Sequence, residues 1–86
     1  MTYPASKELR VFFSNAPYRK TEREIYDAFE KKNDGIINVK LRYDENSKKT
    51  GEGYFIVRNV NSAENLIKLE GEKIFDREFY FNLEDL

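Results

Sequence analysis

The residues best suited to chemistry in this sequence are aromatic rings set between charged side chains. One of them, Tyr54, belongs to the stretch from Lys49 to Val57. If this stretch is a strand, its period of two places Phe55 on one face and Tyr54 on the other. A ring among charged neighbours makes a poor core surface, but its flat face can stack a nucleobase. Gly53 has no side chain, so a neighbouring strand or a ligand can approach closely beside Tyr54.

A second ring, Phe12, occurs in the apolar segment 9–14. If Val11 and Phe13 face a core, Phe12 points to the opposite face. The same alternation predicts outward cations at Arg10, Lys40, Arg42 and Arg58. Rings that stack bases and cations that neutralise phosphates together favour a surface for single-stranded nucleic acid. Two alternatives stay open: a tail of the chain or a protein partner covers the rings, or strands simply favour aromatic residues.

The composition of the chain excludes several classes of function. The 86 residues suffice for one small domain, and 16 acidic against 15 basic side chains give no overall attraction to nucleic acid. The chain has no cysteine and no histidine, which excludes disulfides, Cys/His zinc sites and imidazole catalysis. No apolar run approaches the ~20 residues of a membrane span, and the first residues do not resemble a signal peptide. We expect a nuclear or cytoplasmic protein, not secreted, with no cofactor, no metal and no membrane contact.

Two helices are predicted. Thr21 and Glu24 form a capping box, and an apolar stripe at helical spacing follows before residues 33–35 end the helix. The second helix is predicted to start at Asn61, with a glutamate three residues later, and to end before Gly71 as its C′ residue.

Four strands are predicted from alternating patterns, at residues 9–14, 37–42, 49–57 and 79–83, with a mobile polar loop at 44–50. In the last strand, Phe79 and Phe81 point inward and Tyr80 and Asn82 outward. The order β-α-β-β-α-β predicts an α+β, ferredoxin-like fold, a four-stranded antiparallel sheet with both helices on one face. We expect a flexible lead-in at residues 1–8, the domain at 9–83 and a C-terminal end at 84–86.

This topology brings the first and third strands together at the centre of the sheet. Phe12 and Tyr54 are then neighbours on the open face, and Tyr80 flanks them from the last strand. The remaining expected contacts come from the surrounding polar residues: Arg10, Lys40, Arg42, Lys48, Lys49, Glu52, Arg58 and Asn82.

Two motifs resemble those of the RNA-recognition motif (RRM) family. Residues 11–16 (VFFSNA) resemble its hexamer, and residues 50–57 (TGEGYFIV) resemble its octamer. The resemblance spans residues 9–83 and implies that Phe12 and Tyr54 each stack an RNA base. Glu52 stands where the octamer has its first aromatic residue, and Thr50 where it has a basic one. The resemblance therefore implies a monomeric, non-enzymatic module that binds single-stranded RNA weakly by itself, within a larger RNA-processing or mRNA-binding protein.

Two rival functions follow from the same fold. Peptide-binding members of the family carry Arg-x-Phe before the last strand. Here Arg77-Glu78-Phe79 has these residue types, but in the wrong register relative to the last strand. The first helix is acidic, so a protein partner on the helical face is kept as the alternative. An acylphosphatase-like enzyme needs an anion-binding loop after the first strand. Segment 15–19 has Arg19 but no glycine, so we do not expect an enzyme.

Overall fold

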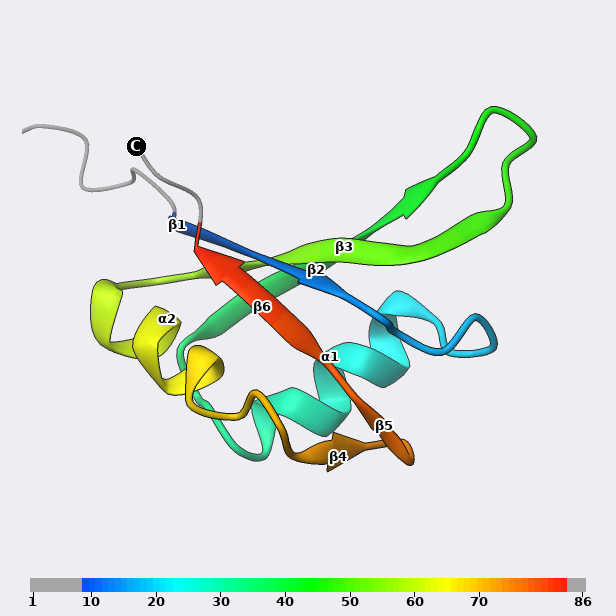
Figure 1. The fold of residues 1–86 in the computed structure, drawn as a ribbon. Coiled ribbons are helices and arrows are strands. Elements are labelled where there is room, and N and C mark those ends of the chain that lie inside the picture. Colours follow the sequence, from blue (N-terminus) through cyan, green and yellow to red (C-terminus); the bar gives the residue numbers. More distant parts are fainter. Residues whose placement is uncertain (1–8, 84–86) are drawn as a thin grey trace, which may run out of the picture.

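The computed structural model describes residues 9–83. Its elements are β1 (Leu9–Ser14), α1 (Glu22–Glu30), β2 (Ile36–Tyr43), β3 (Lys49–Val57), α2 (Val60–Ile67), β4 (Lys73–Ile74), β5 (Arg77–Glu78) and β6 (Tyr80–Leu83) (Figure 1). The predicted order is confirmed, with the short β4–β5 hairpin inserted before the last strand. The segments predicted as lead-in and C-terminal end, 1–8 and 84–86, lie outside the described residues.

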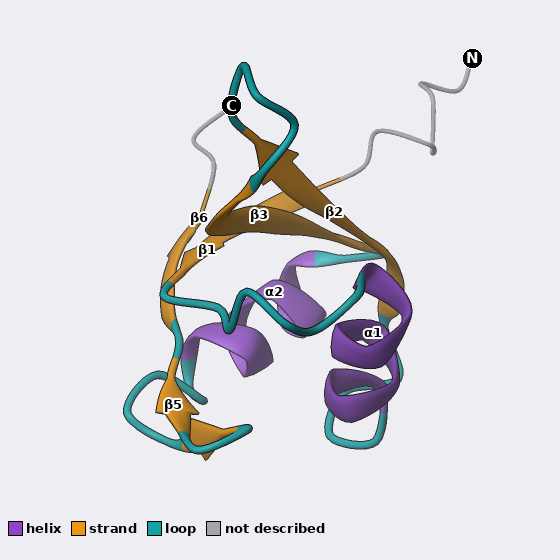
Figure 2. Ribbon diagram, turned by 90° about the vertical axis from the view of Figure 1, so that its right-hand side faces the viewer, coloured by secondary structure: helices purple, strands orange, loops and turns teal. Residues whose placement is uncertain are grey.

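The main sheet has the strand order β2-β3-β1-β6, and every pairing in it is antiparallel. The first and third strands therefore lie at its centre, as the topology predicts. Figure 2 shows both helices on one side of this sheet. Within residues 9–83, no helix lies on the opposite face, and no helix is long and apolar enough to cross a membrane.

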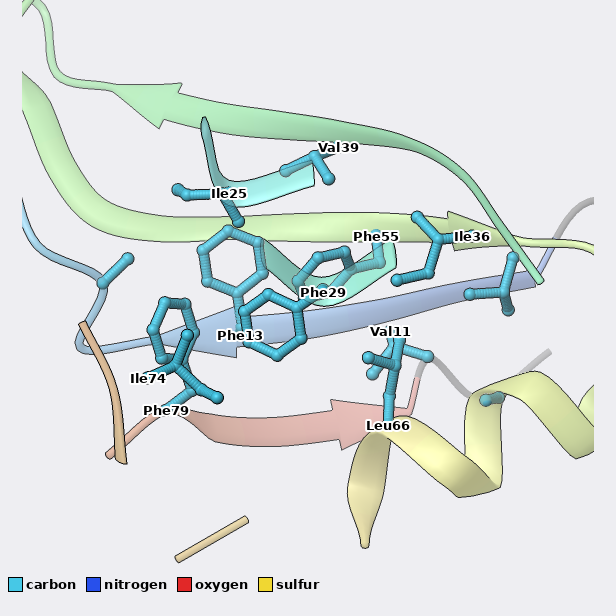
Figure 3. Close-up of a cluster of buried hydrophobic side chains, with 13 residues drawn as sticks. Val11, Phe13, Ile25, Phe29, Ile36, Val39, Phe55, Leu66, Ile74 and Phe79 are labelled. Carbon is cyan, nitrogen blue, oxygen red and sulfur yellow. The ribbon is translucent and has the colours of Figure 1, made fainter. Parts of the chain in front are cut away.

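The core lies between the sheet and the helices and is rich in phenylalanine (Figure 3). Phe13 of β1 contacts Phe55 of β3, with 4.9 Å between ring centroids, and Phe29 of α1 lies 4.8 Å from Phe55 and 5.0 Å from Phe79. All four rings are buried. The odd-numbered positions of the central strands thus face the helices, and the even-numbered positions face the open side.

The first helix starts as predicted. The Thr21 N–H donates to the Glu24 carboxylate at 2.9 Å, and the Glu24 N–H donates to the Thr21 hydroxyl at 3.1 Å. The bond from the Thr21 N–H lowers the pKa of Glu24. The second helix starts elsewhere, because Asn59 rather than Asn61 is its N-cap. Asn59 has an extended backbone and its side chain accepts from the Ser62 N–H at 2.8 Å, whereas Asn61 already lies within the first turn.

Two further boundaries differ from the prediction. The second helix has Lys68 as its C-cap, so Gly71 is not C′ but lies in the turn that follows, at φ +96°. The loop predicted at residues 44–50 is shorter, because Tyr43 pairs with Lys49 and β3 starts there. The Asp44 carboxylate closes the remaining turn by accepting backbone N–H groups two and four residues later.

On both edge strands of the sheet, a glutamate carboxylate accepts a hydrogen bond from an outward-pointing backbone N–H group. On β2, the Leu41 N–H donates to the Glu22 carboxylate at 2.8 Å. On β6, the Phe81 N–H donates to the Glu70 carboxylate at 3.1 Å. An unpaired edge N–H can recruit another strand, so these carboxylates close both edges to strand addition at these positions.

Removal of the Glu22 carboxylate is expected to destabilise the domain, because the Leu41 N–H loses its acceptor. Glu22→Ala should lower the free energy of unfolding by about 1–2 kcal/mol. Glu22→Gln keeps an acceptor oxygen and should lower it less. Urea denaturation measures both variants, and a Glu22→Ala variant as stable as the wild type would show that this hydrogen bond contributes nothing.

Candidate nucleic-acid interface

One row of side chains crosses the open face of the sheet. Tyr54 of β3 pairs with Phe12 of β1 on one side and with Lys40 of β2 on the other. Phe12 pairs in turn with Asn82 of β6. The register thus places a cation, two rings and an amide side by side on four neighbouring strands. These are four of the residues that the sequence predicts for the site.

The two rings contact each other and remain partly exposed. The Phe12 and Tyr54 centroids are 5.6 Å apart, with the rings at 64° to one another. The guanidinium carbon of Arg10 lies 5.0 Å from the centroid of Tyr54, a cation–π geometry. The Arg10 guanidinium therefore holds its positive charge over the Tyr54 ring.

A hollow of about 240 Å³ lies next to this row. Phe12 and Tyr80 line it, together with the charged side chains of Arg42 and Glu52 and the hydroxyl-bearing Ser14. Tyr80 is 48% exposed. Ser14 is an addition to the predicted site, although its even-numbered position in β1 already placed it on this face.

Glu52 does not stand alone on the sheet. Its carboxylate lies 3.6 Å from the guanidinium of Arg42, and both side chains are more than half exposed. The carboxylate is therefore partly compensated where the sequence shows an isolated negative charge between two glycines. Strand alternation does not reveal this pair, because it depends on the register between β2 and β3.

Three predicted cations lie away from the row. Arg58 follows the end of β3, and its backbone N–H donates to the Gly35 carbonyl at 3.0 Å. Lys48 is exposed in the turn between β2 and β3. The Lys49 ammonium donates to the Lys20 carbonyl at 2.7 Å, so it is held by the segment before α1 rather than being free in a loop.

The glycines and the asparagine of the two motifs serve the backbone. A Cβ at Gly53 would overlap the Lys40 carbonyl oxygen, so β2 approaches β3 closely there, as predicted. Gly51 has φ +85°, and its carbonyl accepts the Ala16 N–H at 2.9 Å. Asn15 has φ +68°, which asparagine tolerates, and its amide donates to the Glu78 carbonyl at 2.8 Å.

Comparison of the sequence with known protein families agrees with this geometry. Residues 11–80 match the RNA recognition motif, from the inward Val11 of β1 to Tyr80 of β6. The chain belongs to the RNA recognition motif family. The motif at 50–57 lies on β3, and the motif at 11–16 starts on β1 and continues into the turn after it, so both belong to the two central strands and their ends. No curated protein sequence is significantly similar to the chain.

Solved structures confirm the RRM fold. The second RRM domain of the yeast poly(U)-binding protein Pub1 superimposes with a TM-score of 0.77 at 14% identity, covering 91% of this chain and 95% of that one. The RNA15 RRM gives 0.75 at 22% identity, covering 88% of both chains. The Rna15 RRM with bound GU RNA gives 0.73 at 22%, covering 90% of this chain and 83% of that one.

Several of the features that suggested a protein partner make contacts within the domain. Phe79 is buried among the core rings, so Arg77-Glu78-Phe79 is not an exposed peptide-binding motif. On α1, Glu22 holds the edge of β2, Glu24 closes the capping box and Asp27 pairs with Arg23 at 3.2 Å. Among residues 9–83, no three acidic side chains gather in a way that could hold a metal ion.

Proposed function

We propose that this RRM binds single-stranded RNA on the open face of its sheet. The observation that carries the proposal is the contact between Phe12 and Tyr54, two partly exposed rings on the central strands, with the Arg10 guanidinium over the Tyr54 ring. Base stacking on such rings contributes ~1–3 kcal/mol per base and tolerates any base. The structures to which the chain is similar include the Rna15 RRM with bound RNA.

The strand register supports a short binding site. Two rings stack two bases, and Tyr80 adds a third aromatic surface across the hollow, so the site suits about 2–4 nucleotides. Bases can lie flat on these rings only when they are unpaired, which favours single-stranded over duplex RNA. Few contacts mean weak binding by one domain, and we propose that the monomeric domain works within a larger nuclear or cytoplasmic protein of RNA processing or mRNA binding.

The salt dependence of RNA affinity is expected to reveal phosphate contacts. Arg10, Lys40 and Arg42 are exposed cations on the open face, and neutralisation of about three phosphates gives a slope of log K against log salt of about −2. Lys40→Ala should make this slope shallower by about 0.7. Lys68→Ala, an exposed cation at the end of α2, should leave it unchanged. Fluorescence anisotropy with a labelled uridine hexamer measures the slope, and a value near zero would contradict phosphate contact.

A titration followed by amide chemical shifts tests the proposal as a whole. With pooled short RNAs, we expect shifts at Phe12, Tyr54 and Tyr80. If the sheet does not shift with RNA and residues of α1 such as Tyr26 shift with cell extract, the helical face binds a protein partner instead.

A further inference from the structure

The hollow beside Phe12 carries one acceptor and one donor of opposite charge. The carboxylate of Glu52 and the guanidinium of Arg42 both line it, 3.6 Å apart. The two side chains are 52% and 65% exposed. An ion pair with this exposure is weak, so a ligand can rearrange or share it at little cost. Both charged groups are therefore available to a base that enters the hollow.

The rings at the hollow give such a base a place to stack. Phe12 lines it from β1 and Tyr80 from β6, while Glu52 and Arg42 line it from β3 and β2. A base that lies on either ring presents its edge across the sheet surface. Its hydrogen-bonding groups then meet the carboxylate and the guanidinium, which are the charged side chains of the hollow.

The chemistry of the pair distinguishes the four bases. An ionised carboxylate only accepts hydrogen bonds and a guanidinium only donates them. The Watson–Crick edge of guanine has two adjacent donors, N1–H and N2–H, which match the two carboxylate oxygens, and next to them the acceptor O6, which matches the guanidinium. Cytosine and adenine offer the carboxylate one amino donor each. The single N3–H of uracil lies between two carbonyl oxygens, which a carboxylate repels.

We propose that Glu52, with Arg42 beside it, makes this RRM select guanine over uracil at the base next to Phe12. The inference rests on the proposed function, because it assigns a base to the same surface. It also gives a reason for the carboxylate where the family has a ring. A ring there would bind any base, whereas a carboxylate gives up part of that general affinity in exchange for reading a base edge.

Hexanucleotides that place one guanine at each position of a uridine background test this inference. Kd values for each of them and for the all-uridine hexamer come from fluorescence anisotropy on the wild type, Glu52→Gln and Glu52→Ala. Because one bidentate contact discriminates between bases by about tenfold, we expect the best guanine hexamer to bind about tenfold more tightly than uridine. Both variants should reduce this ratio to within about twofold. Glu52→Phe should raise the affinity for the uridine hexamer.

Glu64→Gln is the matched control, because it removes the same charge from an exposed position of α2, on the other side of the sheet. It should leave the guanine-to-uridine ratio unchanged. A wild type that binds the hexamers without distinguishing them, or Glu52 variants that keep the ratio, would overturn the inference alone. A wild type that binds no hexamer would overturn the proposed function and the inference together.

Discussion

Replacement of Phe12 and Tyr54 together by alanine is expected to lower the affinity for single-stranded RNA by ~2–6 kcal/mol, at ~1–3 kcal/mol for each stacked base. The rings lie side by side on the open face and contribute nothing to the buried cluster between sheet and helices. The domain should therefore remain folded while its binding surface is lost. Isothermal titration with a uridine hexamer measures the affinity, and thermal denaturation checks the fold.

Tyr26→Ala is the matched control for this double variant, because Tyr26 is a partly buried ring on α1, on the helical side of the sheet. It should leave RNA affinity within a factor of about two of the wild type, because its ring stacks no base. Should the double variant bind as tightly as the wild type, the rings do not stack bases. Should Phe12→Ala alone unfold the domain, the ring contributes to the core in solution.

The largest expected effect on stability comes from Gly53→Ala. A Cβ there would overlap the Lys40 carbonyl oxygen and lie 2.7 Å from the tip of the Phe13 ring. The Lys40 carbonyl belongs to the backbone of the paired strand β2 and cannot rotate away, so the two strands would have to separate. We expect a loss of about 3 kcal/mol in the free energy of unfolding, the upper end for overpacking. This is a large share of the stability of a small domain.

Chemical denaturation measures this loss. Glu52→Ala is the control, because it changes the preceding position of β3, where the side chain is exposed on the open face. It should change stability by no more than about 0.5 kcal/mol. A Gly53→Ala variant as stable as the wild type would mean that β2 and β3 are farther apart at this point.

Strand alternation predicted the faces of the sheet correctly. Val11, Phe13, Phe55 and Phe79 are buried as expected, and Phe12, Tyr54 and Tyr80 lie on the open side. This worked because successive side chains of a strand point to opposite faces, so one core residue fixes the face of every other residue in the strand. Helix ends were less predictable. Both Asn59 and Asn61 are suitable cap residues, and only the path of the chain from β3 into α2 selects Asn59.

The contacts of the predicted cations were also not predictable from the sequence. The sequence gives no sign that Lys49 bonds to the Lys20 carbonyl, 29 residues away, or that Arg42 lies beside Glu52. Both contacts depend on where β3 starts and how β2 registers against it. The loop prediction at 44–50 was two residues too long for this reason, since a polar stretch does not reveal how far two strands continue to pair.

The sequence by itself determined the β-α-β-β-α-β order, the two motifs and the assignment of Phe12 and Tyr54 to one face, because these follow from local periodicity. The tertiary structure alone decided that Phe12 and Tyr54 touch, that β2 passes close over Gly53, and that Glu52, Arg42 and Tyr80 share one hollow. Such contacts join residues far apart in the chain. They are set by strand register, which arises from the packing of the whole sheet against its helices rather than from any single segment.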